Sequence, residues 1–529
     1  MAVAVAGVLA VGCNDLDTEP LGSTVTSEQK AAIMANDPSR LADQVNSLQQ
    51  STHMAMRFYS NQHRDFGLAS IFLGLDSRGT DLIGLDDGYN WYSADASWGD
   101  WAGNYYANLI YWRYNYAMIY TCNSIMTILD KDTEDPTSLY TLGQCYIFRA
   151  YSYYMLANMY QLTYANNPDA PCVPIYTDEN MVEAGTVGCA RSTVAQTWQQ
   201  VIDDATKAID CLSRAKEGNV ERPDVRFADV AVAYGLRARA NLFTLKWSDA
   251  AADAQQAINL TSATPYTIAE ASRPGFYSFT EAHNYMWGIQ NPSEATYTQG
   301  VVNFASMMSG WMANGYGSVG CARRISKLLY ADIPDTDARK NWWIDASGKP
   351  GASVPAAYAS YVTENSDIFP AYTNVKFGAA ANTPGSTSGA TDLPIMRVEE
   401  MYLILAEAQG HQSPATGAKT LQDFVKTYRD PAYACAAATT DDVTNAVWLQ
   451  RRIELWGEGF AYFDRLRFQT GIDRRGHGFP SAWVYVVAPD DPVNRYQIVQ
   501  TETQANPLIT PEDALEDQTW TNPQPVADI

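Results

Sequence analysis

Histidine and closely paired cysteines are scarce in this sequence, which limits the metal chemistry that it can support. The 529-residue chain has five histidines, with no His-Glu-x-x-His motif, and eight cysteines, with no Cys-x-x-Cys pair. Structural and catalytic zinc sites need such closely spaced ligands. The sequence therefore does not support a zinc hydrolase or a zinc-stabilised domain, and we expect no cofactor.

Basic residues are also few, and they form no run or stripe. Lysine and arginine number 36 against 59 acidic residues, which gives a formal charge of -23 at neutral pH. A surface of this charge repels polyphosphates, because nucleic-acid binding depends on clustered cations. Nucleic acid is therefore not an expected partner.

No apolar run is long enough to cross a bilayer, which takes about 20 residues. The nearest approach is residues 1–12, MAVAVAGVLAVG, which carry no charge and end in small residues before Cys13. This pattern is typical of the remnant of a signal peptide that precedes a lipidated cysteine. Residues 13–27 are rich in Asp, Thr, Pro, Gly and Ser, as expected for an exposed tether. The alternative is a buried N-terminal strand with a chance cysteine.

Tyrosine and tryptophan, in contrast, are abundant. The chain has 33 Tyr and 14 Trp but only 16 Phe. Both side chains combine a flat apolar face with a polar edge, which suits wet binding surfaces as well as cores. The composition therefore indicates ligand binding alongside core packing.

Helical periodicity dominates much of the chain. Thr193 and Gln196 have the spacing of a capping box, and an apolar stripe that includes Trp198 continues to Leu212. A second unit, at about 228–257, has the pattern of a helical hairpin with small residues on its facing sides. It partly fits a tetratricopeptide repeat, but no second copy aligns with it. These patterns predict a mostly helical protein.

Long stretches rich in Gly, Pro, Asn and Ser interrupt the helices, at 74–103, 261–320 and 347–392. Loops of this length in a compact protein are usually functional or disordered. Residues 315–320 match Gly-x-Gly-x-x-Gly, but no buried strand precedes them, so a dinucleotide site is not indicated. We expect instead a loop that enters a helix near Cys321.

Several segments resemble the SusD/RagB family of Bacteroidetes outer-membrane lipoproteins, in that family's order. Residues 13–20, CNDLDTEP, are similar to its lipidated start, and residues 112–125 to its W-x-x-x-Y-x-x-I-x-x-[AC]-N-x-I helix. Residues 148–151, FRAY, are similar to its L-R-A-x helix, and residues 496–507 to its closing segment. The resemblance spans nearly the whole chain.

Two later segments carry the most specific resemblance. Residues 392–408, DLPIMRVEEMYLILAEA, follow the pattern P-x-x-R-x-x-E-M-x-L-x-x-A-E-A almost completely. Residues 451–467, RRIELWGEGFAYFDRLR, resemble R-x-x-E-L-x-x-E-G-x-R-x-x-D-L-x-R, with Ala461 in place of the usual arginine. That departure is expected to weaken one internal ion pair without changing the assignment.

The resemblance implies an all-α fold of tetratricopeptide-like helical hairpins, elaborated by long ligand-binding loops. It implies a single helical body over residues 28–529, which includes both signature segments. It further implies a nutrient-binding protein, not an enzyme, that is lipid-anchored at Cys13 to the outer membrane and exposed at the cell surface. Its expected partner is a SusC-like TonB-dependent transporter, over which it docks as a lid.

The aromatic residues of the first two loop stretches lie where the resemblance places ligand loops. Sugar recognition needs exposed flat rings with amide or guanidinium groups beside them. From the first stretch we predict that the ligand contacts Arg78, Tyr89, Asn90, Trp91 and Trp98. From the second we predict Tyr285, Trp287, Tyr297, Trp311, Asn314 and Tyr316. The alternative for each ring is that it caps the helical core.

Acidic residues on two apolar helical segments invite an enzymatic interpretation, because glycosidases use paired carboxylates. Arginines such as Arg397 and Arg467 lie at helical spacing from them, so ion pairs between packed helices explain them more simply. The residues concerned are Glu399, Glu400, Glu407, Glu454, Glu458 and Asp464.

A weaker candidate is a calcium site among aspartates of the first loop stretch. Calcium prefers several oxygen ligands, but the spacing here fits no known calcium loop. The residues concerned are Asp76, Asp81, Asp86 and Asp87.

Three functions follow. The first is capture of an oligosaccharide for a transporter, and the second is capture of an oligopeptide for the same kind of transporter. The third, from a different class, is an exported glycoside hydrolase.

Overall fold

The computed structural model describes residues 39–85, 88–292, 300–510, 513 and 520–529. The predicted signal remnant, Cys13 and the tether lie outside these residues, as do Tyr297, Asp86 and Asp87. None of the described helices is both long and apolar enough to span a membrane.

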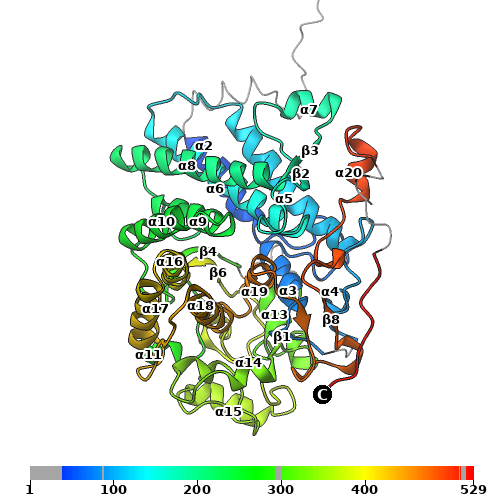
Figure 1. The fold of residues 1–529 in the computed structure, drawn as a ribbon, viewed down its shortest axis with the longest axis vertical. Coiled ribbons are helices and arrows are strands. Elements are labelled where there is room, and N and C mark those ends of the chain that lie inside the picture. Colours follow the sequence, from blue (N-terminus) through cyan, green and yellow to red (C-terminus); the bar gives the residue numbers. More distant parts are fainter. Residues whose placement is uncertain (1–38, 86–87, 293–299, 511–512, 514–519) are drawn as a thin grey trace, which may run out of the picture.

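Long helices form the N-terminal half of the molecule. They are α2 (Ser39–Ser51), α3 (Leu68–Ser77), α5 (Tyr106–Met126), α6 (Pro136–Met159), α8 (Val194–Glu217), α9 (Val230–Phe243) and α10 (Trp247–Leu260). Neighbours in this series pack in pairs, with α6 against α5 and α8, and α9 against α8 and α10. Figure 1 shows the stack of α5, α6, α8, α9 and α10 in the upper part of the molecule, with α3 below it.

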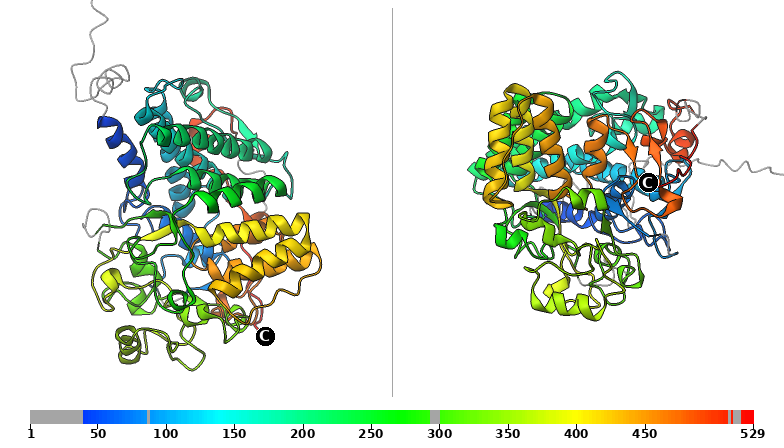
Figure 2. Two further views of the ribbon diagram at one scale, coloured as in Figure 1. Left: turned by 90° about the vertical axis from the view of Figure 1, so that its left-hand side faces the viewer. Right: turned by 60° about the horizontal axis from the view of Figure 1, so that its bottom comes forward.

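The stack continues into the C-terminal half, because α10 also packs against α16. The helices that extend it are α16 (Val398–Gln412), α17 (Pro414–Tyr428), α18 (Thr440–Glu454) and α19 (Ala461–Arg467). The left view of Figure 2 shows the long helices lying nearly parallel to one another in layers. This arrangement confirms the predicted fold of stacked helical hairpins.

Short elements connect the long helices. The short helices are α4 (Ser93–Ala96), α7 (Met181–Val187), α11 (Ile268–Ala271), α13 (Phe304–Met308), α14 (Lys327–Ala331), α15 (Ala356–Glu364) and α20 (Gln500–Ala505). The described residues also form antiparallel two-stranded sheets, which pair β1 (Leu82–Ile83) with β5 (Arg324–Ile325), β2 (Pro171–Pro174) with β3 (Arg191–Thr193), β4 (Tyr285–Ile289) with β6 (Leu393–Arg397), and β7 (Ile472–Asp473) with β8 (Val486–Val487).

Local sequence signals explain the two helical units that were predicted. Thr193 caps α8 by accepting a hydrogen bond from the backbone of Gln196, whose side chain accepts one from the backbone of Thr193. In the hairpin α9–α10, Ala250, Ala254 and Ala257 are fully buried, so the two helices approach closely. Trp198 lies in the core as predicted.

Two local predictions were wrong. The stretch 74–103 begins inside α3, a helix whose residues are all buried, so its first residues are core rather than loop. No helix begins at Cys321 either: residues 317–319 form a single 3-10 turn, β5 follows at Arg324, and α14 begins at Lys327.

Candidate functional site

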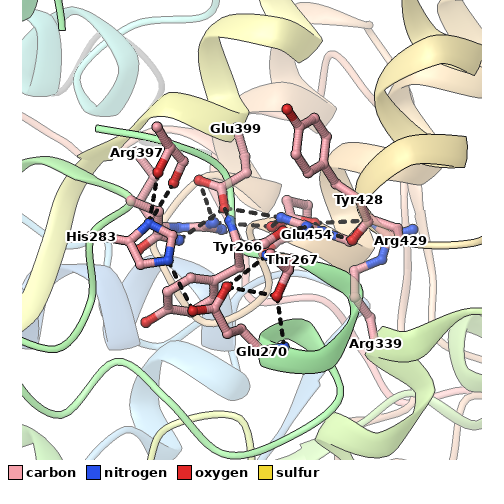
Figure 3. A network of polar contacts seen from close by, with 12 residues as sticks. Tyr266, Thr267, Glu270, His283, Arg339, Arg397, Glu399, Tyr428, Arg429 and Glu454 are labelled. Atoms are coloured by element: carbon pink, nitrogen blue, oxygen red, sulfur yellow. Dashed lines mark hydrogen bonds and ion pairs between the residues drawn. The ribbon is translucent and has the colours of Figure 1, made fainter. Parts of the chain in front are cut away.

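The signature carboxylates lie in the core, where they form a network of ion pairs. Glu454 is fully buried and contacts Arg397 at 3.0 Å, Arg429 at 2.7 Å and Arg339 at 3.1 Å. Arg429 also contacts Glu399 at 2.9 Å. Figure 3 shows the two carboxylates among these guanidinium groups. Burial raises the pKa of Glu454, but the three cations outweigh it and hold that pKa well below its ordinary value.

Further pairs extend this arrangement. Glu458 lies 2.6 Å from Lys376 and 2.8 Å from Arg397, and burial lowers the pKa of Lys376 to about 8 despite the contact with Glu458. The buried ion-pair network is therefore Arg339, Lys376, Arg397, Glu399, Arg429, Glu454 and Glu458. The other candidate carboxylates are also paired with buried arginines, in the pairs Glu400–Arg239, Glu407–Arg467 and Asp464–Arg451.

These contacts give the acidic residues a packing role, as the helical spacing predicted. Each carboxylate is at most 3% exposed, so a substrate cannot reach it. A carboxylate held ionised by several cations is also a poor general acid.

The two described aspartates of the calcium candidate, Asp76 and Asp81, have hydrogen-bond partners within the protein. Asp76 is buried, and its carboxylate accepts a hydrogen bond from the backbone of Gly459. Asp81 is paired with Arg452, whose Nε donates to it at 2.8 Å. Within the described ranges, no group of three or more His, Cys, Asp or Glu side chains is placed to hold a metal ion.

Two predicted ligand residues of the first loop stretch are buried instead. Arg78 is fully enclosed, pairs with Asp100 at 2.6 Å, and lies over the rings of Trp98 and Tyr496 at 4.5 Å from each centroid. Trp98 is also fully buried and packs against Tyr462. The prediction for Arg78 and Trp98 was therefore wrong, because an enclosed side chain cannot face a ligand.

Asn90 is buried as well, and its amide organises the loop. Its side-chain oxygen accepts from Arg323 at 2.8 Å and from the backbone of Tyr92 at 3.0 Å, and its side-chain nitrogen donates to the carbonyl of Leu85 at 3.1 Å. These bonds occupy both ends of the amide, so Asn90 positions the neighbouring rings rather than the ligand.

Three predicted residues of the second stretch are core residues. Tyr285 and Trp287 belong to β4, whose five residues are all buried against the first signature segment through β6. Trp287 packs edge-on against Phe148, and its ring nitrogen donates to the carbonyl of Arg226 at 3.1 Å.

Trp311 is likewise buried, in a smaller apolar cluster beside the main core. Its ring packs against Tyr358 and Phe369 with centroid distances of 4.7 and 4.6 Å. The prediction that Tyr285, Trp287 and Trp311 face a ligand was therefore wrong.

The other predicted rings that the structure describes, Tyr89, Trp91 and Tyr316, come together at the surface. Trp91 lies 6.2 Å from Tyr316 with the two rings near perpendicular, and Tyr89 lies 6.5 Å from Tyr316. Tyr89 is 55% exposed, and the other two rings are half-buried. Segments more than 200 residues apart in sequence thus place their rings side by side. Asn314, which is exposed, lies two residues before Tyr316.

His63 completes this group, and the sequence interpretation missed it. Its ring stacks on Trp91 at 4.7 Å with an interplanar angle of 20°, and its Nδ1 lies 2.5 Å from the Tyr316 hydroxyl. Burial lowers the pKa of His63, so the ring is neutral at pH 7. Its local sequence gives no signal beyond neighbouring aromatic residues. We call His63, Tyr89, Trp91 and Tyr316 the aromatic cluster.

Glycine fixes the position of Tyr316 within this cluster. A Cβ at Gly317 would lie 1.9 Å from the carbonyl oxygen of Ser309, and one at Gly315 would lie 2.9 Å from the Cα of Ser306. Only glycine allows the loop to pack this closely at both sides of the tyrosine. The Gly-rich segment therefore serves to place a ring at the surface.

A surface cavity lies away from the aromatic cluster, at the ends of α6, α8, α9 and α10. It has a volume of about 910 Å³ and is lined in part by Tyr140, Arg222 and Tyr234. None of the predicted ligand residues that the structure describes lines it. The candidate site is therefore the aromatic cluster and not this cavity.

Family comparisons cover both halves of the chain. Residues 75–242 match a family described as "Starch-binding associating with outer membrane", and residues 270–524 match one described as "SusD family". No curated protein matches the sequence.

Several solved structures of Bacteroides proteins have a similar fold. A SusD-like carbohydrate binding protein from Bacteroides vulgatus aligns over 91% of this chain and 99% of its own, with a TM-score of 0.72 and 21% identity. A SusD superfamily protein from Bacteroides thetaiotaomicron aligns over 89% and 98%, with a TM-score of 0.66 and 17% identity. Surface glycan-binding protein A from Bacteroides thetaiotaomicron, in complex with laminarihexaose, aligns over 88% and 97%, with a TM-score of 0.59 and 16% identity. With the signature segments placed in its core and both halves of its sequence matched, this chain belongs to the SusD family.

Proposed function

We propose that this protein captures an oligosaccharide at the cell surface and delivers it to a partner SusC-like TonB-dependent transporter. The observation that carries the proposal is the convergence of Tyr89, Trp91 and Tyr316 on one exposed patch beside His63. Flat rings stack on the apolar faces of sugar rings, while hydroxyl, imidazole and amide groups bond the sugar hydroxyls. Asn314 supplies an exposed amide close by in sequence.

The family matches support a glycan over a peptide as the ligand. One matching family is described as starch-binding, and one protein of similar fold was solved with laminarihexaose. Aromatic surfaces also bind peptides, so the decisive evidence is a direct comparison of the two ligand classes.

Calorimetric titration makes that comparison. We expect saturable binding of at least one oligosaccharide from a panel that includes laminarihexaose and oligosaccharides of other linkages, and no binding of oligopeptides of similar length. Binding of peptides alone would contradict the proposal. Release of shorter sugars during the titration would instead favour the hydrolase.

Anchoring at the outer membrane through lipid on Cys13 is part of this proposal. Cys13→Ser should release the protein from membranes, because the lipid attaches to the thiol. Fractionation in a strain that lacks the transporter measures this directly. Retention of the serine variant in detergent-free membranes would show that something other than the lipid holds the protein there.

The transporter partner has its own test. A stable complex of this kind buries more than about 1,000 Å². Affinity purification of the tagged transporter in mild detergent should therefore co-isolate this protein. Its absence from such a preparation would contradict the partnership while leaving glycan capture to be judged by titration.

A further inference from the structure

His63 packs against two rings of the aromatic cluster, from the segment that joins α2 to α3 (residues 52–67). Its ring stacks on Trp91 at 4.7 Å and meets the ring of Tyr316 edge-on at 5.8 Å, with an interplanar angle of 61°. Its Nδ1 lies 2.5 Å from the Tyr316 hydroxyl. A flipped imidazole would place a carbon there and lose this hydrogen bond, so the contact defines one orientation of the ring.

The imidazole of His63 carries a single N–H at pH 7. Burial lowers its pKa below the ordinary value of 6.5, so the neutral ring predominates. In a neutral histidine one ring nitrogen donates and the other accepts, and the partner of one nitrogen decides which of them holds the proton. The contact with Tyr316 therefore determines what the other nitrogen can do.

Tyr316 is the donor in this contact. Its hydroxyl has no other hydrogen-bond partner within the described part of the chain, so Nδ1 of His63 is the acceptor that the structure offers to its proton. A phenol is also a stronger acid than the N–H of a neutral imidazole, and the stronger acid donates in such a pair. Nδ1 therefore accepts, and the proton of the imidazole lies on Nε2.

The Nε2 atom of His63 is accessible to a ligand. It has no hydrogen-bond partner among the described residues, and it does not belong to the unpaired polar atoms that the protein encloses. The side chain as a whole is half-buried. An unpaired donor that is not enclosed can be reached by water or by a bound molecule. The aromatic cluster thus presents an N–H donor at the surface beside its rings.

We propose that His63 determines specificity in the aromatic cluster by donating a hydrogen bond from Nε2 to an oxygen atom of the bound glycan. Tyr316 and Trp91 position this donor, the first by donating to Nδ1 and the second by stacking on the ring. A ligand without an acceptor at that point would leave the N–H unpaired in the contact, which weakens its binding. The inference rests on the proposed function, because it names the donor of the same site.

The position of the proton can be tested without any glycan. Nitrogen NMR of the full chain, labelled at its histidine nitrogens, distinguishes a protonated ring nitrogen from a bare one, and His63→Gln identifies the signals of His63. We expect the form with the proton on Nε2 to predominate at neutral pH. In Tyr316→Phe, which keeps the ring and removes the hydroxyl, the signals should shift toward a mixture of the two forms. A predominant Nδ1–H form in the wild type, or unchanged signals in Tyr316→Phe, would overturn the proposal.

Calorimetric titration with laminarihexaose, or with the oligosaccharide of the panel that binds more tightly, tests the donor role. Two substitutions separate the ring nitrogens, because the amide nitrogen of glutamine can occupy the place of Nε2, whereas that of asparagine reaches only the place of Nδ1. His63→Gln should keep the affinity within about fivefold of wild type, and His63→Asn should weaken it by about tenfold or more. His63→Phe, which keeps a flat ring against Trp91 but has no N–H, should weaken it as much as His63→Asn does.

A second histidine provides the matched control. His283 lies outside the aromatic cluster and its ring nitrogens contact Thr264 and Glu270, so His283→Gln should leave glycan affinity unchanged. Thermal midpoints show which variants are folded, and the three substitutions of His63 test the donor independently if one of them fails to fold. Equal affinity of His63→Asn and His63→Gln, or wild-type affinity in His63→Phe, would overturn the donor role while glycan capture stands. Absence of glycan binding to the wild type would instead refute the proposed function, and the donor role with it.

Discussion

The buried ion-pair network and the aromatic cluster draw their residues from different parts of the sequence. Arg397, Glu399, Glu454 and Glu458 all belong to the two signature segments, and their contacts join helices and strands in the core. The aromatic cluster takes its rings from connecting segments that carry no signature at all.

This difference separates what the family pattern specifies from what it leaves open. Ion pairs in the core fix how the helices pack, whereas surface loops more often carry the binding function of a protein. Substitutions in the buried ion-pair network should therefore lower stability, whereas substitutions in the aromatic cluster should weaken ligand binding and change stability much less.

The largest effect is expected in the network. Glu454→Gln should lower the free energy of unfolding by about 3–5 kcal/mol, toward the upper end, because it leaves three buried arginines without their shared anion. Chemical denaturation measures the change. Lys419→Gln, in an exposed pair, is the control and should cost less than about 0.5 kcal/mol. If Glu454→Gln lowers the free energy of unfolding no more than Lys419→Gln does, the buried ion-pair network does not stabilise the fold in the way that we infer.

Trp311 distinguishes a core role from a binding role. From the sequence we predicted that it contacts the ligand, but the structure buries it in a small apolar cluster. Trp311→Ala should cost about 3–5 kcal/mol of stability through the cavity it leaves, in the lower part of that range because a satellite cluster can relax. Glycan affinity of the folded variant should match wild type. Reduced affinity with unchanged stability would return Trp311 to the site.

Asp76 provides a contrast with the ion-paired carboxylates of the core. It is a buried carboxyl, and no cationic side chain among the described residues is in contact with it. Burial raises its pKa to about 7. Because the unfolded carboxyl ionises at lower pH, this group lowers the free energy of unfolding as the pH rises from about 4 to about 7. Asp76→Asn, which can still accept from Gly459, should raise the free energy of unfolding at pH 8 by on the order of 2–4 kcal/mol, at about 1.4 kcal/mol per pKa unit.

The same variant should give a much smaller gain at pH 4, where the carboxyl is protonated when folded and only partly ionised when unfolded. Denaturation at the two pH values provides the measurement. An equal change at both would mean that packing, not ionisation, governs this position.

The sequence predicted the helical core well because each helix carries its own periodic stripe. Trp198 could be assigned to the core from its neighbours along α8, and the small residues of α9 and α10 predicted their hairpin. These are local signals, which one sequence contains in full.

The candidate site was harder to predict, because burial of a loop ring depends on residues far away in the sequence. Trp311 is covered by Tyr358 and Phe369, and Trp287 by Phe148, none of which is near it in the chain. His63 was missed for the same reason, because the rings that it contacts come from other loops. Composition could therefore indicate an aromatic site without saying which rings form it.

The most direct test of the account is titration of wild type and Trp91→Ala with the oligosaccharide that binds best, alongside their thermal midpoints. Trp91 is half-buried within the aromatic cluster, so its loss should weaken binding by roughly 1–3 kcal/mol, as for an aromatic anchor at a recognition surface. Its thermal midpoint should stay much closer to wild type than that of Glu454→Gln. Unchanged affinity in a folded Trp91→Ala protein would contradict the assignment of the aromatic cluster as the glycan-binding site.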